Sequence, residues 1–495
     1  MSMFDSFPIM NAYAVNLDWI LKKIGEFKKD IEETNRNYNN MQQLFEELQA
    51  YVGNQIAEIN AYVENQINEA TISRIVNDKL EEMKNDGTLV EIFSNYFTWV
   101  SPINYGAVGD GVADDTVAVE KAFKRGFVVS PNGKSYVVTR TIDIDNFVTV
   151  KFGNSTIVDR KTWKLGSKEE QALLIFRNGC DITGLNIVGL NGEYWSNDIE
   201  TIDIQFAMDA YGKCVLNNCK FADLWGYGVR IYNCATPSID NCIFSNVGGK
   251  YKLNNEHDSF GDGVYLGTVD EKQFVKITNC KIYGKYVGST FSRCGVTLEY
   301  NDKVDRKLEL VNCDIQNYNR CVHIEQCGRV DVHTVNSDFK GDIIFFEIKG
   351  KDIRVRANGC VFKTTRNDYS GSFGLIRNGS IVMDSCKCNN FTAMCWNVGT
   401  ENPVIICRNC EITVSANNGI GPAILHTSSC KGVFENCTVK LTEKPRFLAG
   451  SDSTFVLINT NIITSVQQEY SYNARTVCLE SSAPNFANVH NVSVT

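Results

Sequence analysis

A short motif recurs through the C-terminal three quarters of the chain and constrains its fold more than any other feature. The motif is a cysteine, any residue, and then usually isoleucine, valine or phenylalanine, and an asparagine commonly precedes the cysteine. Ser337 and Thr460 replace the cysteine in two copies, and the other copies contain Cys180, Cys219, Cys242, Cys280, Cys313, Cys360, Cys386, Cys410 and Cys437. Successive copies lie 23 to 39 residues apart, most often 23 to 27, so that one copy marks one turn of a solenoid.

This repeat predicts a parallel β-helix of about eleven rungs, in which the longer copies carry insertions in loops. The small residues should stack at one inward position of every rung. The preceding asparagines tolerate the left-handed backbone conformation and should form a ladder of side-chain amides at a turn. The chain has 19 cysteines, no answering pair of CxxC motifs and no signal peptide at its start. We therefore expect unpaired thiols, a reducing compartment, and neither a metal site nor a cofactor.

Composition excludes several other functions. The chain has 495 residues and a net charge of −9, and such an acidic balance argues against nucleic-acid binding, which needs clustered lysine and arginine. No run of about 18 apolar residues occurs, so no insertion into a membrane is expected.

Residues 16–97 have apolar positions at helical spacing and no proline, which predicts a long helical region. Within it, residues 50–60 and 61–71 are two copies of an 11-residue unit. An 11-residue period gives about 3.67 residues per turn, which is typical of a nearly straight coiled coil. A helix lying on its own domain is the alternative. We favour self-association, because the apolar stripe over residues 45–67 is long and the remaining positions are polar.

Residues 99–126 contain a glycine-rich turn followed by Asp114-Asp115-Thr116, which predicts the start of a helix through Phe123. The segment YGAVGDGVADDTVAVEKAF resembles the N-terminal cap of the pectate-lyase-like superfamily, which right-handed β-helix tail spikes of bacteriophages share. The stretch NAYAVNLDWILKKI near the start is similar to tail appendage proteins of phages. The resemblance implies a trimeric tail spike of the virion, assembled in the host cytoplasm, which binds and often cleaves a host surface polysaccharide and is held by phage tail or collar proteins at its N-terminus. It implies an attachment region at 1–98, a cap at 99–126 and a right-handed β-helix at 127–495.

The strands that follow the longer loops place acidic residues on one outward face. Alternation of inward Val, Ile and Leu predicts an outward column of Glu299, Glu325 and Glu347 on successive rungs, with His323 alongside. Asp262 lies just before one of these strands and could reach the same face. Neighbouring rungs are about 4.8 Å apart. The pair Glu299 and Glu325 would suit a retaining glycosidase, whereas Glu299 and Glu347 would suit an inverting one, and the sequence does not decide between them.

Other residues near this column are candidates for substrate binding. Flat aromatic side chains suit sugar rings, although they also seal the loops of a β-helix, and arginines could bind acidic sugars. The candidates are Trp225, Tyr232, Tyr265, Asp258 and Arg230, with Arg293 as a further arginine. We expect a glycoside hydrolase that depolymerises the glycan. A non-catalytic receptor-binding fibre, a polysaccharide lyase using Asp258, Asp262 and Arg230, and a cellular polysaccharide enzyme remain the alternatives.

Overall fold

The computed structural model describes residues 69–85 and 99–492, apart from gaps at 162–171, 190–205, 225, 249–260, 288–289, 302, 365–371, 377–378, 392, 397–403, 416–422, 427–430, 443–445, 450–453, 465–474 and 480–488. The chain divides into two compact units, residues 1–98 and 99–495. In the first unit, helix α2 (Glu69–Asn85) is described. The predicted coiled-coil stripe at 45–67 lies outside the described residues. No helix in the described part of the chain has the length and apolar character that a membrane span needs.

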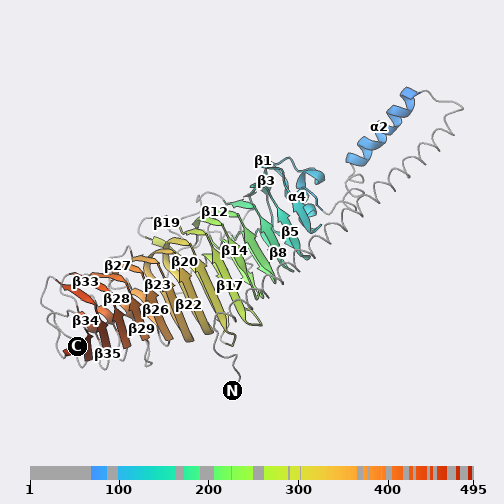
Figure 1. Ribbon diagram of the computed structural model, residues 1–495. Coiled ribbons are helices and arrows are strands. Elements are labelled where there is room, and N and C mark those ends of the chain that lie inside the picture. The colour runs from blue at the N-terminus through green and yellow to red at the C-terminus, as the bar shows by residue number, and fades with distance from the viewer. Residues whose placement is uncertain are drawn as a thin grey trace, which may run out of the picture. The chain divides into compact units, whose positions relative to one another are not determined.

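The second unit is a right-handed parallel β-helix, as the repeat and the cap motif predicted (Figure 1). Between Phe127 and Thr464 the described strands follow three sheets in a fixed order, and each strand of these sheets pairs in parallel with the equivalent strand of the next turn. The motif-bearing rungs are not the whole solenoid, because strands stack before Cys180 and after Thr460 as well. The estimate of about eleven rungs was therefore too low, since the terminal rungs lack the motif.

The strands of the three sheets are as follows. Sheet 1 consists of β4 (Ile142–Ile144), β7 (Leu174–Phe176), β10 (Met208–Tyr211), β13 (Val229–Tyr232), β16 (Asp262–Leu266), β20 (Thr290–Asn301), β25 (Ser372–Ile376), β28 (Ala393–Trp396), β31 (Ala423–His426) and β34 (Arg446–Ala449). Sheet 2 consists of β2 (Phe127–Val129), β5 (Val148–Lys151), β8 (Cys180–Thr183), β11 (Cys214–Asn217), β14 (Ser238–Asp240), β17 (Gln273–Thr278), β21 (Arg306–Val311), β26 (Gly379–Asp384), β29 (Val404–Arg408), β32 (Lys431–Glu435), β35 (Thr454–Ile458), β37 (Arg475–Leu479) and β38 (Val489–Val492). Sheet 3 consists of β1 (Asp110–Asp114), β3 (Ser135–Val138), β6 (Thr156–Asp159), β9 (Asn186–Val188), β12 (Lys220–Leu224), β15 (Ile243–Val247), β18 (Lys281–Tyr283), β24 (Val361–Thr364), β27 (Lys387–Phe391), β30 (Glu411–Ser415), β33 (Thr438–Thr442) and β36 (Asn461–Thr464).

Two long strands, β22 (Asp314–Val335) and β23 (Asp338–Asn358), bend through all three sheets and form most of two adjacent turns. The short strand β19 (Tyr286–Val287) forms an antiparallel hairpin with the start of β20. At the N-terminal end of the solenoid, a 3-10 turn (Pro102–Tyr105) and helix α4 (Thr116–Phe123) form the cap. Helix α4 packs against β2, β3 and β4, and its Val119, Ala122 and Phe123 are fully buried.

The predicted start of helix α4 is confirmed, but Asp114 and Asp115 accept hydrogen bonds from different parts of the backbone. Asp115 occupies the N-cap position, yet its carboxylate accepts the backbone N–H groups of Val108 (2.7 Å) and Gly109 (3.1 Å). The carboxylate of Asp114 accepts the N–H of Thr116 at 3.0 Å. The two adjacent acids therefore tie the glycine-rich turn to the beginning of the helix.

The asparagine ladder is confirmed. The eight predicted ladder asparagines all have a positive φ, between 44° and 55°: Asn218, Asn241, Asn279, Asn312, Asn336, Asn409, Asn436 and Asn459. The side-chain amide of Asn312 donates to the amide oxygen of Asn279 at 3.1 Å, and that of Asn459 donates to Asn436 at 2.8 Å. Each of these turns has only two residues, the asparagine and the small residue after it, between a strand of sheet 2 and a strand of sheet 3.

The small residue that follows joins consecutive turns through its thiol or hydroxyl. The backbone N–H of Cys219 donates to Sγ of Cys242 at 3.4 Å, and Sγ of Cys242 donates to the carbonyl of Asp240 at 3.2 Å. Ser337 repeats this pattern, because its hydroxyl accepts the N–H of Cys313 at 3.0 Å. Cysteine, serine and threonine exchange here because each is small and is both donor and acceptor. The 16 cysteines whose side chains are described are all buried, and none of them forms a disulfide bond.

Cys180 was wrongly assigned to this column. It lies at the start of β8 in sheet 2, in register with Cys214. The two-residue turn of that rung is Gly184-Leu185, so Leu185 occupies the small-residue position. The glycine supplies the positive φ of 72° that the asparagines supply elsewhere.

The hydrogen bonds of the stacked thiols and hydroxyls lead to a testable prediction at Ser337. Replacing Ser337 with alanine leaves the buried N–H of Cys313 without its acceptor, which should lower the free energy of unfolding by about 1–3 kcal/mol. Ser337→Cys restores the group that other rungs use and should remain close to the wild type. Urea unfolding followed by circular dichroism measures both variants. Equal stability of the alanine variant and the wild type would show that the hydrogen bond between Cys313 and Ser337 does not stabilise the stacking of these turns.

Candidate functional site

The strands of sheet 1 bring the predicted glutamates together. In the pairing of β20 with β22, Thr297 lies opposite His323 and Glu299 lies opposite Glu325, as strand alternation predicts. The apolar residues between them, such as Val296 and Leu298, are fully buried on the inward side. The sequence pattern therefore identified both the face and the register of this part of the site.

Glu347 does not continue the column. In β23 it lies opposite His323, whereas Lys349 lies opposite Glu325. The predicted register was thus wrong by two residues. A shift of two residues preserves the alternation of apolar and polar positions, so the pattern alone cannot detect it. The offset between β22 and β23 is 24 residues at Gln316, which lies opposite Lys340, and again at Glu325, so the irregular step near Tyr318 does not cause the shift.

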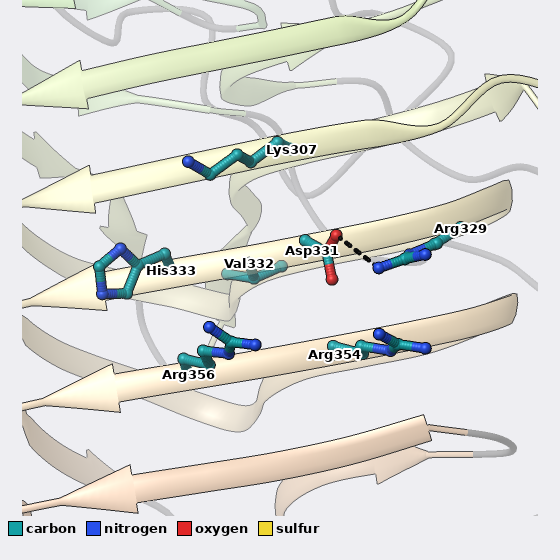
Figure 2. A pocket seen from close by; sticks show the side chains of 7 residues that line it. All are labelled: Lys307, Arg329, Asp331, Val332, His333, Arg354 and Arg356. Atoms are coloured by element: carbon teal, nitrogen blue, oxygen red, sulfur yellow. Dashed lines mark hydrogen bonds and ion pairs between the residues drawn. The ribbon is translucent and has the colours of Figure 1, made fainter. Parts of the chain in front are cut away.

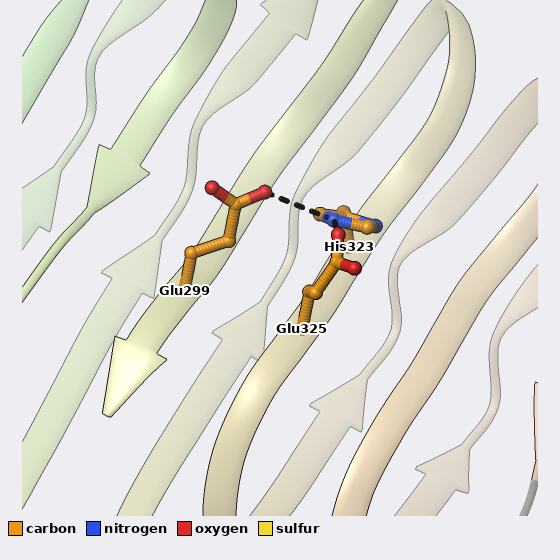
Figure 3. A group of neighbouring side chains, drawn as sticks. All are labelled: Glu299, His323 and Glu325. Atoms are coloured by element: carbon orange, nitrogen blue, oxygen red, sulfur yellow. Dashed lines mark hydrogen bonds and ion pairs between the residues drawn. The ribbon is translucent and has the colours of Figure 1, made fainter. Parts of the chain in front are cut away.

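Four of the predicted residues belong to one connected network of charged groups. Figure 3 shows the imidazole of His323 between the carboxylates of Glu299 and Glu325. Its Nε2 atom lies 3.0 Å from Oε1 of Glu299 and 3.1 Å from Oε2 of Glu325. Arg293 bridges the network to Asp262, because it donates to Oε1 of Glu299 at 2.9 Å and to Oδ2 of Asp262 at 2.8 Å.

The tautomer of His323 follows from its second neighbour. Nη1 of Arg320 lies 3.2 Å from Nδ1 of His323. An arginine can only donate, so Nδ1 accepts and the ring proton of the neutral imidazole is on Nε2. His323 therefore donates toward the carboxylates of Glu299 and Glu325.

The same groups could be considered as metal ligands, since Nε2 and one oxygen of each glutamate lie within 4.8 Å of one another. A metal ion needs the lone pair of Nε2, which the proton occupies in this tautomer. Arg293 and Arg320 also place two positive charges beside the cluster. The donor set thus does not fit a metal.

The predicted outward column is largely buried where Glu299 and His323 lie. Glu299 is 4% exposed, and Asp262 and His323 are fully buried. Glu325 retains 27% exposure of its side chain and is the open side of the network. Like charges on neighbouring strands are destabilising, and Arg293 and His323 lie between the acids here.

The buried carboxyls differ in their acidity. Burial acts to raise the pKa of Glu299, but the hydrogen bond from His323 and the charge of Arg293 outweigh it, so that the pKa lies below its ordinary value. For Asp262 the same burial dominates and raises the pKa above its ordinary value, although Arg293 favours the ionised form. Of these two carboxyls, Glu299 is therefore the one that is held ionised.

The predicted substrate-binding residues are mostly engaged within the protein. Arg230 forms a buried bidentate pair with Asp209, with distances of 2.7 and 2.6 Å. It also lies over the ring of Phe206 at 4.3 Å. The ring of Tyr232 stacks on Tyr211 at 5.2 Å.

Tyr265 is only 6% exposed and belongs to a small apolar cluster with Phe206 and Tyr227 on this outer face. The sequence left two roles open for these aromatic residues, and their burial accords with sealing the face rather than with binding a sugar. Trp225 and Asp258 lie outside the described residues.

Sequence reasoning missed Arg320 and Asp209, and it considered Arg293 only as a ligand for acidic sugars. Arg293 lies six residues before Glu299 on one strand, an even spacing that alternation could have used. Arg320 lies three residues before His323, an odd spacing, yet Nη1 of Arg320 and Nδ1 of His323 are 3.2 Å apart. No regular pattern marks that contact.

The buried pair yields a stability prediction with a matched control. Arg230→Met leaves the carboxylate of Asp209 buried without its partner and should lower the free energy of unfolding by about 3–5 kcal/mol. Arg177 makes a similar bidentate pair with Asp143, but each side chain there is 45% exposed. Arg177→Met should cost less than about 1 kcal/mol. Equal effects on urea unfolding would contradict the structural role of Arg230.

Comparisons with known proteins place the fold in context. No protein-family model and no curated protein sequence matches the chain. Among solved structures, tailspike protein 3 of bacteriophage CBA120 has 12% identity and a TM-score of 0.47, with 85% of this chain and 70% of that one covered.

Two further structures belong to other kinds of protein. PfbA, a surface adhesin of Streptococcus pneumoniae, has 12% identity and a TM-score of 0.43, over 77% of this chain and 90% of that one. Endo-xylogalacturonan hydrolase from Aspergillus tubingensis has 12% identity and a TM-score of 0.35, over 80% of this chain and 100% of that one. Phage tailspike proteins are thus among the solved structures that this chain resembles, and at these identities the likeness concerns the fold.

Proposed function

We propose that the protein is a phage tail spike that binds a host surface polysaccharide and hydrolyses it at Glu299 and Glu325. The observation that carries this proposal is the pair of carboxylates held by one imidazole, with oxygen atoms within 4.8 Å of each other. Retaining glycosidases use carboxyl groups about 5–5.5 Å apart, whereas inverting enzymes use about 6.5–9.5 Å. The pair therefore favours retention over inversion, and it does not need Glu347.

The environments of the two glutamates suggest separate roles. Glu299, whose pKa is lowered, is suited to act as the ionised nucleophile that attacks the anomeric carbon. Glu325 has the more exposed side chain and is suited to give a proton to the departing sugar oxygen and to take one from water afterwards. His323 orients both carboxylates, and Asp262 acts through Arg293 as a positioning residue. A sugar would reach Glu299 from the open side, next to Glu325.

A non-catalytic glycan-binding spike is the second candidate, and one observation favours it. Glu299 is almost completely buried and has two positively charged or donating partners, which also suits a purely structural role. A lyase has less support, because Arg230 is committed to Asp209 and Arg293 bridges two acids. Trimerisation through the N-terminal helical region, and docking of that region to a phage tail, belong to the same proposal.

Glycan cleavage tests the site directly. The purified chain is incubated with surface polysaccharide extracted from candidate host bacteria, and the polymer length is followed by size-exclusion chromatography. Glu299→Gln and Glu325→Gln should each slow shortening by at least about 100-fold, because each removes a group that acts on the reacting atoms. Glu411→Gln, which changes an exposed glutamate of sheet 3, serves as the control and should keep the wild-type rate.

The controls separate the two candidate functions. Thermal unfolding of each variant must first show that the fold is retained. Unchanged cleavage in both site variants would place the chemistry elsewhere. Binding without any shortening by the wild type would favour the non-catalytic spike.

A further inference from the structure

A row of side chains, all polar or charged except the first, follows the outer face of sheet 2, separate from the buried network on sheet 1. Six consecutive turns, from β11 to β23, contribute one residue each in direct register: Val215, Ser238, Lys276, Glu309, His333 and Arg356. All six are at least partly exposed. Five steps of about 4.8 Å give this row a length of about 24 Å. We call it the sheet 2 track.

Two recesses lie on the track, one at each end. The first has a volume of about 600 Å³ and is lined by polar side chains that include Ser238, Asp240 and Thr278. The second, of about 200 Å³, is lined by Lys307, Arg329, Asp331, His333, Arg354 and Arg356 together with Val332. Glu309 borders both, because it lines the first recess and pairs with Lys307 of the second at 2.6 Å. The two recesses therefore lie next to each other on one face.

The second recess is basic in a protein that is acidic. Figure 2 shows Arg354 and Arg356 on one strand, Lys307 two strands away, and Asp331 between them with its bond to Arg329. The recess has four cationic side chains and one acidic side chain, Asp331. Two further acidic residues lie next to the recess, because Glu309 lies opposite His333 and Asp352 lies opposite Arg329 in the strand pairing. Among the described residues, no ion pair is made by Lys276 or Arg356. Lys276 and Arg356 are thus two exposed cations of the track without an ion-pair partner in the described part of the chain.

We propose that the sheet 2 track binds a linear acidic polysaccharide, with its acidic groups at Arg354 and Arg356 and its neutral sugars over the polar recess. Arginine is suited to this role because its planar guanidinium binds carboxylate or phosphate through two parallel hydrogen bonds. Hydroxyl and amide side chains in the first recess provide donors and acceptors for sugar hydroxyls. This binding surface is distinct from the proposed hydrolytic site. It is a second, non-catalytic contact with the polysaccharide, and it uses none of the residues on sheet 1.

Direct binding tests the track with polymers of defined charge. The full chain is titrated by calorimetry with polygalacturonate as the carboxylate polymer, with linear polyphosphate as the phosphate polymer, and with dextran as the neutral polymer. We expect an acidic polymer to bind, with an affinity that falls as salt rises, and dextran to bind at least tenfold more weakly. Whether polygalacturonate or polyphosphate binds better identifies the acidic group.

Variants assign the binding to the track. Arg354→Ala combined with Arg356→Ala should weaken binding at least tenfold, whereas Arg408→Ala, an exposed arginine of the same sheet outside the track, should not. Glu299→Gln should bind as the wild type does, so loss of hydrolysis and loss of this contact are distinguishable. Failure of both acidic polymers to bind, equal binding of dextran, or unchanged affinity in the double variant would overturn the proposal.

Discussion

The rest of the structure depends on the two-residue turn between sheet 2 and sheet 3. Its asparagine takes a left-handed backbone conformation, and the residue after it places a thiol or hydroxyl inside the solenoid. That side chain accepts the N–H of the previous turn and donates to a nearby carbonyl, as Ser337 does with Cys313 and Val335. A buried N–H without an acceptor is costly, so the stacking of one turn on the next is fixed at this point. The register is the same on both sides of the turn, as Thr278 opposite Val311 in sheet 2 and Lys281 opposite Asp314 in sheet 3 show.

Much of the fold could be predicted from the sequence because this constraint is local and repeats. The pairs Asn312-Cys313 and Asn436-Cys437 predict their turns, because few other positions require these residue types together. The failures have physical causes as well. Cys180 has the right residue type at the start of a strand, where a buried thiol packs equally well. Glu347 is displaced by two residues, and such a shift leaves the alternation of the strand unchanged.

The candidate site shows a different limit of sequence reasoning. Strand alternation placed Glu299, His323 and Glu325 together, but it could not say whether solvent reaches their face. Tyr265 and Phe206 form an apolar cluster on that face, and the charged groups are neutralised by arginines rather than by water. Burial of an unpaired charge is strongly unfavourable. A column of acids can therefore be buried only where partners such as Arg293 lie between them, and the partners depend on side-chain reach rather than on register.

The lengths of the connections distinguish the faces of the solenoid. From β11 to β36, the passage from sheet 2 to sheet 3 always takes two residues, so these turns carry no insertions. The long connections, such as the one between β15 and β16, lead instead into sheet 1. Sheet 1 can therefore vary around a buried site, while sheet 2 stays open and regular. On the functions proposed above, a long polymer would use the evenly spaced contacts of the regular sheet 2, and hydrolysis of one bond would use the enclosed group of charges on the variable sheet 1.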